Sequence, residues 1–526
     1  MRLRVWEEEN RSAAPTAVLD ISNQPIEGFS EHRRYLIECP EDLQSSQLYV
    51  DDVCLQKIPG YWMWQPGFYA GEVDLELILS DQTTIISWRV DVSNDPNKSG
   101  KQSWQQFIQD IVDFDSARLV GSEPGQHQLG GISRFAGVWL RYARIRQFFP
   151  RYAQGLKSVL LNPIQGYKQQ TQRYTLGRLK KLTPSITQQL IQHADLLTKT
   201  GVNTSSTFRD IQHLQVQVQA TYTNNTWDAP ANRQLKFQLN LIDRRVTQVL
   251  TDLKRELKIT ANENSETRTS LKERLIRRIS HLTIIRKHLR NVAQQLPFSA
   301  TDAGQSYGID FDSVVGHPHY QLTWRMGVRL LRDGISGLVS DESHYLIPSW
   351  EIYEVWCFIA LTNGLKRKFP YLKWNLSQHS GRLTFRAKHE GLNIKLHNQK
   401  SFRAILHRPS MDPDVPHSIS GMRRPDLVLE VENSGMTQFI CLDSKYTSRS
   451  KRILEEMASA HIYHDSLRWE RKRPVLSLLL VPRNENLAEL ESESWWQEHQ
   501  TGCFTMQNVE SSSHLLDRLW THLKIN

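Results

Sequence analysis

Two apolar runs between residues 427 and 442 constrain the fold of this chain more than any other feature. Each run is long enough for a β-strand, and the Asn-Ser-Gly sequence at 433–435 is typical of a hairpin turn, because Asn and Gly tolerate positive φ. Asp426 begins the first run, and Asp443 and Lys445 end the second on one side of the strand, since side chains alternate along it. If the runs pair, two carboxylates and an ammonium group meet. The pattern predicts a divalent-metal site with an adjacent cation.

These residue types suit phosphodiester hydrolysis. Mg²⁺ prefers oxygen ligands, and one or two protein carboxylates with a substrate phosphate are enough to hold it. Asp426 and Asp443 would supply the carboxylates, and the backbone carbonyl of Ser444 is a candidate further ligand for Mg²⁺ or for Mn²⁺ in its place. Lys445 would orient or deprotonate the attacking water, or offset charge on the phosphate. We therefore expect a hydrolytic site in which the ion acts as a Lewis acid.

Length and charge limit the class of protein. A chain of 526 residues exceeds a single hydrophobic core and predicts several domains. The net charge of +9 favours an anionic partner such as nucleic acid. The longest apolar run, at 476–481, is too short to span a membrane, and the first residues lack the apolar core of a signal peptide. We expect a soluble, cytoplasmic protein with no membrane partner and with reduced thiols.

The hydrophobic patterning predicts a multidomain α+β protein. Residues 1–120 contain short alternating segments typical of a β-rich domain, as an antiparallel sandwich or small barrel, with a helix following Ser103 as N-cap. Residues 121–335 have helical spacing, with a first helix that we expect to end at Pro150. Residues 336–526 combine helices and strands in the order of an α/β domain with a central mixed sheet.

Two long amphipathic segments within about 235–296 predict a coiled-coil-like antiparallel helical hairpin, joined by a polar loop at 260–268. We expect the outer faces of both helices to be basic. The basic residues are Arg244, Arg245, Lys254, Arg255, Lys272, Arg274, Arg277, Arg278, Arg286, Lys287 and Arg290. A solvated helical face is the preferred interpretation, and an arm that tracks phosphates or docks a partner is the alternative.

The motif at Pro425, Asp426, Asp443 and Lys445 resembles that of the PD-(D/E)xK nuclease superfamily. The resemblance implies a restriction-endonuclease-like C-terminal domain and metal-dependent nuclease activity. Many members of the superfamily place a glutamate from a preceding helix near the metal. Glu354 best matches this pattern as a catalytic or metal-binding residue, and Glu351, one turn away, is a substitute candidate.

Three further segments resemble a family related to McrC, the nuclease subunit of McrBC-type restriction systems. They are 227–237, 350–356 and 460–465, and the similarity departs from the usual family residues at Ala229, Ala231, Ala460 and His464. The resemblance implies a role in restriction or antiphage defence, together with a separate AAA+ NTPase, an ATPase or a GTPase. The sequence contains no Walker A pattern, so we do not expect the chain itself to hydrolyse NTP.

Several polar residues near the motif have two interpretations. Arg423 and Arg424 precede the first acid, where they would contact DNA phosphate or remain solvated. For His461 and Tyr463 we favour packing, with positioning of DNA phosphate or of the lysine as the alternative. Glu430 and Glu432 share the strand face of Asp426, but only a bend would bring them near the metal.

The sequence thus predicts a Mg²⁺-dependent endonuclease that acts on DNA. The main alternative is a non-catalytic adaptor that binds DNA or a partner through a nuclease-like fold. RNA and branched DNA remain open as substrates, and so do an oligomeric assembly, the cleavage specificity, and the ligand of the N-terminal domain.

Overall fold

A computed structural model describes the chain apart from thirteen short ranges. These are 12–13, 21–23, 81–84, 134–136, 176–177, 180, 193–216, 263–268, 303–310, 338–341, 380–381, 408–414 and 524–526. The chain divides into two compact units, and the first contains 1–144, 252–279 and 333–526. The second contains 145–251 and 280–332. The domain bounds expected from the sequence, 1–120, 121–335 and 336–526, stay predictions.

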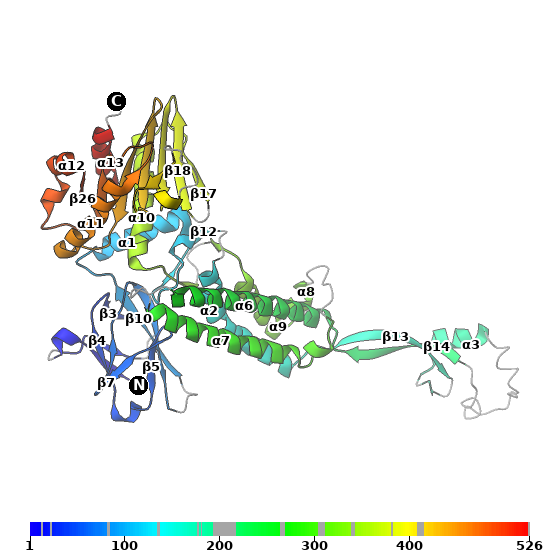
Figure 1. Cartoon of the computed structure of the whole chain (residues 1–526). Helices are drawn as coiled ribbons and strands as arrows, with labels where there is room; N and C mark the ends of the chain where they lie inside the picture. Colours follow the sequence, from blue (N-terminus) through cyan, green and yellow to red (C-terminus); the bar gives the residue numbers. More distant parts are fainter. Residues whose placement is uncertain are drawn as a thin grey trace, which may run out of the picture. The chain divides into compact units, whose positions relative to one another are not determined.

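The β-rich region of the first unit consists of two sheets that share one core (Figure 1). The first sheet has the order β2(Ala17–Leu19), β1(Leu3–Glu7), β4(Tyr35–Glu38), β8(Tyr61–Trp64) and β7(Gln56–Ile58). The second has the order β16(Ser343–Tyr345), β11(Gln126–Gln128), β9(Gly71–Ile78), β10(Ile85–Ser93) and β3(Ile26–Ser30). In addition, β5(Gln47–Val50) pairs with β9, and β6(Val53–Cys54) pairs with β5. Because β3 and β10 pair in parallel, the expectation of a wholly antiparallel sandwich is wrong for this pair.

Helix α1(Lys101–Asp115) joins the β-rich region to the C-terminal region of the same unit. It begins after Gly100, so the expectation that Ser103 caps it is wrong. Its apolar side chains, spaced at helical intervals, are buried against α10(Ser349–Lys368), where the Phe107 and Trp356 ring centroids lie 4.1 Å apart. The indole N–H of Trp356 donates to Asp110 over 2.9 Å.

The C-terminal region contains a seven-stranded mixed sheet, which confirms the expected central mixed sheet (Figure 1). Its order is β17(Asn375–His379), β18(Arg382–His389), β19(Leu392–Asn398), β22(Leu427–Asn433), β23(Met436–Ser444), β25(Ser477–Val481) and β26(Thr501–Thr505). Neighbours from β17 to β23 are antiparallel, and β23, β25 and β26 are parallel. The turn between β22 and β23 has positive φ at Ser434 and Gly435, a conformation that Gly adopts without steric cost.

Helices cover both faces of this sheet. Leu478 and Leu480 of β25 belong to the core that contains α10 and α13(Val509–Leu523). The alternate residue Leu479 packs with Ile453 and Met457 of α11(Ser450–Ser466). Since side chains alternate along a strand, β25 is buried on both faces, as its uninterrupted apolar sequence predicts. The sheet is therefore the rigid support of the residues that end β23.

The second unit is mainly helical. It contains α3(Pro184–Gln192), α8(Phe311–Val315) and α9(Pro318–Leu331), and it shares α2(Val138–Leu161), α6(Pro230–Asn262) and α7(Thr269–Ala293) with the first unit. Asp243 of α6 lies 3.8 Å from Arg286 and 3.9 Å from Arg290 of α7, as an antiparallel hairpin requires. α6 extends to residue 262, into the expected loop, and residues 263–268 lie outside the described residues. No helix among the described residues is long and apolar enough to cross a membrane.

Two features of the helical region differ from expectation. α2 continues through Pro150, because the proline occupies an exposed position while Phe148, Tyr152 and Leu156 on the same helix are buried. Burial of this face outweighs the loss of one backbone hydrogen bond at the proline. The strands β13(Gly166–Thr175) and β14(Gln217–Thr226) form an antiparallel ribbon of ten residue pairs that the sequence patterns did not indicate.

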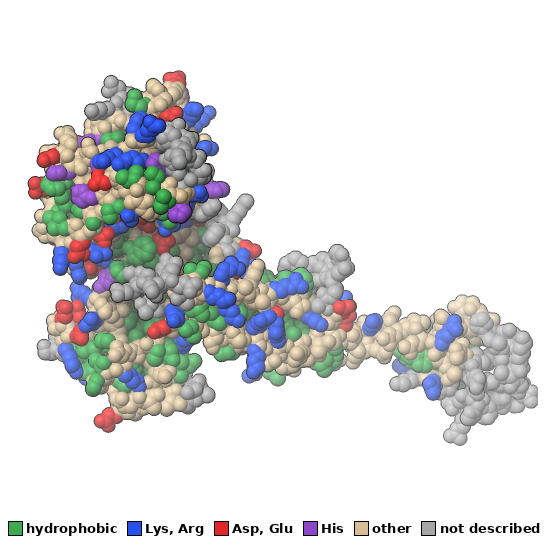
Figure 2. All heavy atoms as spheres, viewed as in Figure 1, with side chains coloured by type: hydrophobic (Ala, Val, Ile, Leu, Met, Phe, Trp, Pro, Cys, Tyr) green, Lys and Arg blue, Asp and Glu red, His purple; other side chains and the backbone are tan. Residues whose placement is uncertain are grey.

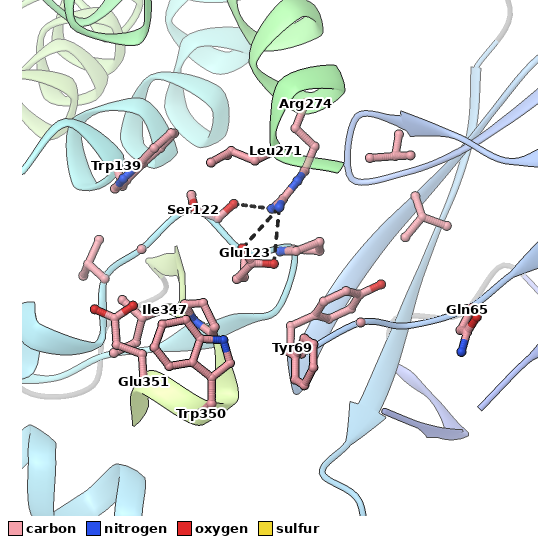
Figure 3. A pocket seen from close by; sticks show the side chains of 18 of the residues that line it. Gln65, Tyr69, Ser122, Glu123, Trp139, Leu271, Arg274, Ile347, Trp350 and Glu351 are labelled. Carbon is pink, nitrogen blue, oxygen red and sulfur yellow. Dashed lines mark hydrogen bonds and ion pairs between the residues drawn. The ribbon is translucent and has the colours of Figure 1, made fainter. Parts of the chain in front are cut away.

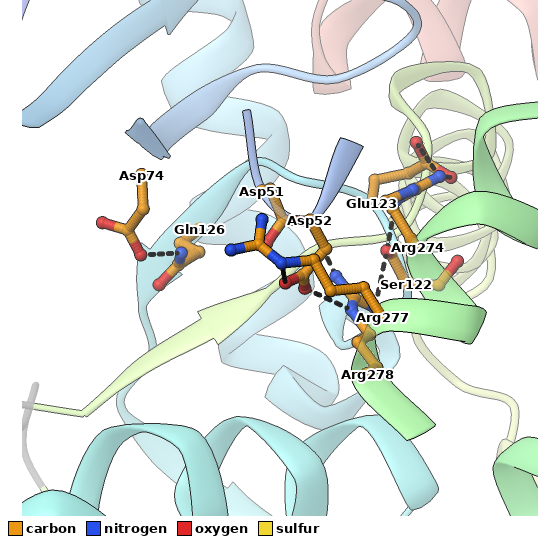
Figure 4. A network of polar contacts seen from close by, with 9 residues as sticks. All are labelled: Asp51, Asp52, Asp74, Ser122, Glu123, Gln126, Arg274, Arg277 and Arg278. Carbon is orange, nitrogen blue, oxygen red and sulfur yellow. Dashed lines mark hydrogen bonds and ion pairs between the residues drawn. The ribbon is translucent and has the colours of Figure 1, made fainter. Parts of the chain in front are cut away.

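Three arginines expected on the outer basic face of the helical hairpin are instead engaged within the first unit (Figure 4). Arg278 is fully buried and contacts Asp51 at 2.7 Å and Asp52 at 3.2 Å. Arg274 contacts Glu123 at 3.2 Å, and Arg277 contacts Glu76 at 2.7 Å. The interpretation as a solvated face is therefore wrong for these three residues. Arg244, Lys254, Arg255, Lys272, Lys287 and Arg290 are exposed, and Figure 2 shows Lys and Arg side chains along α6 and α7.

Candidate active site

The hairpin of β22 and β23 brings the two predicted acids to one end of the sheet. Leu427 lies opposite Leu442, so continuing the antiparallel register by one residue places Asp426 opposite Asp443. The Asp426 carboxylate accepts a hydrogen bond from the backbone N–H of Ser444 over 2.8 Å. This bond joins the start of one strand to the end of the other and fixes the Asp426 carboxylate beside the Asp443–Lys445 segment.

Asp443 is 1% exposed and has two donors on the same oxygen. Lys445 Nζ lies 2.8 Å from Asp443 Oδ2, and the Ser459 hydroxyl donates to this atom over 2.7 Å. Burial lowers the pKa of Lys445, but the charges of Asp443 and Asp426 outweigh burial and raise it above its ordinary value. Lys445 is therefore held as a cation. This charge favours orienting water or offsetting phosphate charge over the alternative role of deprotonating water.

Glu354 reaches the same region from α10 and is 5% exposed. Its carboxylate accepts hydrogen bonds from Gln399 over 2.8 Å and from Asn398 over 3.4 Å. Burial raises the pKa of Glu354, and the charge of Asp443 raises it further against these hydrogen bonds. The pKa of Asp426 is also raised well above its usual range. Burial is the largest cause, and repulsion from Asp443 and Glu354 comes next. Three acidic groups thus repel one another where Lys445 supplies the nearby positive charge.

This donor set fits a hard divalent cation. Carboxylate oxygens are the ligands that Mg²⁺ prefers, and a cation would relieve the repulsion that raises the pKa of Asp426. Within the described ranges, no group of three or more His, Cys, Asp and Glu side chains is placed to hold a metal ion alone. Asp426 and Asp443 would therefore hold the ion with other oxygens, for which water, substrate and the Ser444 carbonyl are the candidates.

Glu351 does not join this group, although it lies one turn from Glu354. It lines a separate cavity of ≈ 460 Å³ together with Tyr69, Glu123 and Trp350 (Figure 3). Arg274, from α7, lies on the wall of that cavity and contacts Glu123. Of the two glutamates proposed from the sequence, the structure places only Glu354 among the side chains whose charges act on Asp426 and Asp443.

The four residues proposed to contact DNA or support the site differ in position. Arg424 and His461 are exposed, whereas Arg423 is partly buried and its backbone pairs with Phe402 in both directions, over 2.8 and 3.0 Å. Burial raises the pKa of the Tyr463 phenol, and the charges of Asp443 and Asp426 raise it further. Tyr463 therefore lies within electrostatic reach of both carboxylates, whereas His461 faces solvent. Their roles stay predictions.

The sequence patterns did not single out two residues that fix the acids. Ser459 donates to Asp443 from α11, and Gln399 donates to Glu354 from the residue after β19, where it has a φ of 53°. The Gln399 backbone N–H also donates to the carbonyl of Asp426. An isolated serine and glutamine carry no distinguishing pattern in the sequence. The only available signal was the position of Ser459 on the helix that follows the lysine.

Glu430 takes part in a different cluster, on the other side of the sheet from the α10 core. It lies 2.7 Å from Lys395, 2.8 Å from His397 and 3.4 Å from Lys400. Glu432 accepts a hydrogen bond from Asn393 over 3.0 Å. These glutamates therefore have partners on neighbouring segments and serve sheet structure.

The Glu430 cluster makes stability depend on pH. Burial raises the pKa of Glu430, but the hydrogen bond from His397, the charge of Lys400 and the hydrogen bond from Lys395 outweigh burial and lower the pKa to about 2, from 4.5. Because the folded-state pKa is below the unfolded one, this stabilisation is present above pH 4.5 and is lost as the pH falls toward 2. We expect Glu430→Gln to lower the free energy of unfolding at pH 7 by about 2–3 kcal/mol.

Urea denaturation of both proteins at pH 7 and pH 3 measures this effect. The difference between wild type and Glu430→Gln should shrink at pH 3, whereas Glu498→Gln, with a side chain that is 77% exposed, should match wild type at both. A difference of the same size at both pH values would contradict the assignment.

Comparison with known families agrees with this geometry. The segment 351–474 matches the sequence model of the PD-(D/E)XK nuclease superfamily and contains Glu354, Asp426, Asp443 and Lys445. The match makes this part of the chain similar to the superfamily, whose nucleases typically use divalent metals such as Mg²⁺. No curated protein and no solved structure matches the chain.

Proposed function

We propose that the protein is a Mg²⁺-dependent endonuclease that hydrolyses phosphodiester bonds in DNA. The observation that carries this proposal is the meeting of Asp426, Asp443 and Lys445 at one end of a mixed sheet, within a segment that matches a nuclease superfamily. The net charge of +9 supports a polyanionic substrate.

The proposed reaction assigns a task to each side chain of the site. Bound at Asp426 and Asp443, a divalent ion would supply Lewis-acid stabilisation of the charge that develops on the phosphate. The Lys445 ammonium, held by Asp443, donates hydrogen bonds to the attacking water or to a phosphate oxygen and offsets negative charge. The Ser459 hydroxyl holds the Asp443 carboxylate in place, and the Ser444 N–H holds that of Asp426. The two carboxylates therefore need little rearrangement during the reaction.

The cellular role is proposed from the resemblance to the McrC-related family. In this proposal the nuclease acts in restriction or antiphage defence and works with a separate AAA+ NTPase. The absence of a Walker A pattern from the sequence supports a division of labour in which a partner hydrolyses the nucleotide.

One observation favours the alternative of a non-catalytic adaptor. Glu354 is engaged by Gln399, and no group of three metal-ligating side chains is assembled among the described residues. An adaptor, however, does not require a partly buried lysine that is paired with Asp443 and charged by two acids, so we retain the adaptor as the second candidate.

Removal of divalent metal tests the proposed activity. We expect the purified full-length protein to cleave plasmid DNA with Mg²⁺, in the presence of its NTPase partner if it needs one. Excess EDTA should abolish cleavage, and added Mg²⁺ should restore it, because Lys445 is the only cation among the described residues that forms an ion pair with these acids. Electrophoresis of supercoiled, nicked and linear forms measures the result. Binding of DNA without cleavage in any metal would support the adaptor instead.

A further inference from the structure

A cavity of ≈ 590 Å³ opens beside the catalytic lysine within the first unit. Lys445, Tyr446 and Arg449 line it from the segment after β23, and Trp350 lines it from α10. Phe68 and Lys98 line it from the β-rich region. We call this space the outer cavity. The cavity of ≈ 460 Å³ that Glu351 lines in Figure 3 shares Gln65, Phe68 and Trp350 with the outer cavity. These three side chains therefore lie at the boundary between two adjoining cavities.

The outer cavity offers aromatic faces that the core does not use. Phe68 is 40% exposed and Trp350 is 41% exposed. Behind them, Tyr446 is fixed by a hydrogen bond of 2.6 Å between its hydroxyl and that of Ser99, and its ring lies 5.9 Å from that of Trp104. The wall is therefore rigid on one side, and two large apolar rings remain open to a ligand on the other. Exposed aromatic rings beside a reactive centre are suited to stacking on a planar group.

Positive charge gathers on the same wall. Lys98 Nζ lies 4.9 Å from the ring centroid of Tyr446 and 3.1 Å from His32 Nε2. Burial lowers the pKa of Lys98, the charges of Glu31 and Asp95 raise it, and the charge of Arg449 lowers it, with burial as the largest cause. Arg449 is exposed, and no ion pair to another described residue is found for it. Asp95 and Glu456 also line the cavity, but Lys98, Lys445, Arg449 and Arg452 outnumber these acids, which favours an anion such as a phosphate.

We propose that the outer cavity binds one unpaired nucleotide of the DNA strand being cut, next to the scissile phosphate. Lys98 and Arg449 contact its phosphate, and Phe68 and Trp350 stack on its base. The proposal rests on the proposed nuclease function and adds a substrate feature: the β-rich region contributes directly to substrate binding.

The size and chemistry of the cavity select this ligand. Its volume falls within the ~300–1,000 Å³ typical of small-molecule sites, which admits a nucleotide and excludes a base-paired duplex. In a duplex, both faces of each base are already stacked, so aromatic rings can stack only on a base that has left the helix or was never paired. Since Lys445 lines both the cavity and the active site, a nucleotide held here adjoins the bond to be hydrolysed.

Fluorescence of 2-aminopurine tests the proposal on the full-length protein. The probe is a duplex with a single-stranded flap that carries 2-aminopurine at successive positions near the junction, with Ca²⁺ in place of Mg²⁺ to suppress cleavage. We expect wild type to quench the probe at one position, through stacking. Phe68→Ala and Trp350→Ala should abolish this quenching and weaken flap binding by about 5- to 100-fold each, the range of base–aromatic stacking.

Two controls separate stacking from folding. Phe68→Tyr should retain quenching, because it keeps the aromatic face. Tyr371→Ala removes an aromatic side chain that is 63% exposed and does not line the cavity, and it should bind like wild type. Lys98→Ala should weaken flap binding and reduce its dependence on salt.

The outcomes distinguish this inference from the proposed function. If wild type cleaves DNA in Mg²⁺ but Phe68→Ala and Trp350→Ala bind and quench like wild type, the nucleotide site is overturned and the nuclease stands. If wild type cleaves no DNA, the nuclease proposal fails. Flap binding that depends on both rings would still uphold the site in that case, and a failure to bind flap DNA would overturn it.

Discussion

Lys445→Ala is expected to slow DNA cleavage by about 10²–10³-fold, the effect of removing one preorganised donor that stabilises developing charge. The side chain contributes a cation beside two buried acids, and the charges of Asp443 and Asp426 raise its pKa. Alanine removes this charge and leaves the Ser459 hydroxyl as the side-chain donor to Asp443 among the described residues. Single-turnover cleavage of a labelled duplex in saturating Mg²⁺ measures the loss without the contribution of product release.

A control substitution at another lysine and a measurement of folding show whether the loss of cleavage is specific to Lys445. Lys451→Ala removes an exposed lysine at the start of α11 and should cleave at the wild-type rate. The far-UV circular dichroism of Lys445→Ala should match that of wild type, since the sheet around it is held by the parallel pairing of β23 with β25. Cleavage by Lys445→Ala within a few-fold of wild type would remove Lys445 from the reaction.

Arg278→Ala is expected to lower the free energy of unfolding of the first unit by about 3–5 kcal/mol, because truncation of one partner leaves buried charges uncompensated. The side chains of Arg278 and Asp51 are both 0% exposed, and Asp52 is 4% exposed (Figure 4). Burial lowers the pKa of Arg278, but the charge of Asp51 and the neighbouring groups raise it above its ordinary value. The arginine is therefore charged at every pH at which the protein folds.

Guanidinium denaturation followed by tryptophan fluorescence measures the Arg278→Ala effect, as a shift in the midpoint of the transition. Arg255→Ala is the control, because this arginine on the same helical hairpin is 70% exposed and lies 3.5 Å from Asp252. Exposed pairs contribute about 0–1 kcal/mol, so its midpoint should scarcely move. Equal midpoints for the two variants would show that the buried pair contributes no stability.

The sequence predicted the motif hairpin because its signal is local. Two apolar runs, a turn with Gly435 and the alternation of side chains along a strand are sufficient to place Asp443 and Lys445 on one side. The helix at 349–368 has an equally local signal, in the proline before it and the proline after it. In both cases neighbouring residues decide the conformation.

Features that depend on distant partners were not predictable in this way. The basic pattern on α7 is the same whether an arginine faces water or Asp51, which is 227 residues away from Arg278 in the sequence. Pro150 would end an isolated helix, but burial of the opposite side of α2 keeps it helical. Ser459 and Gln399 belong to residue types without a distinguishing pattern, and only their distances to Asp443 and Glu354 identify them.

By itself, the sequence determined which acids and which lysine form the candidate site and which strands carry them, since strand alternation and turn chemistry are local properties. Only the tertiary structure decided that Lys445 is held as a cation by buried acids, and that the acids are fixed by Ser459 and the Ser444 N–H. It also decided that the site adjoins a cavity lined by Phe68 and Lys98 from the β-rich region. The physical reason is that burial and charge–charge interaction depend on side chains brought together from distant parts of the chain.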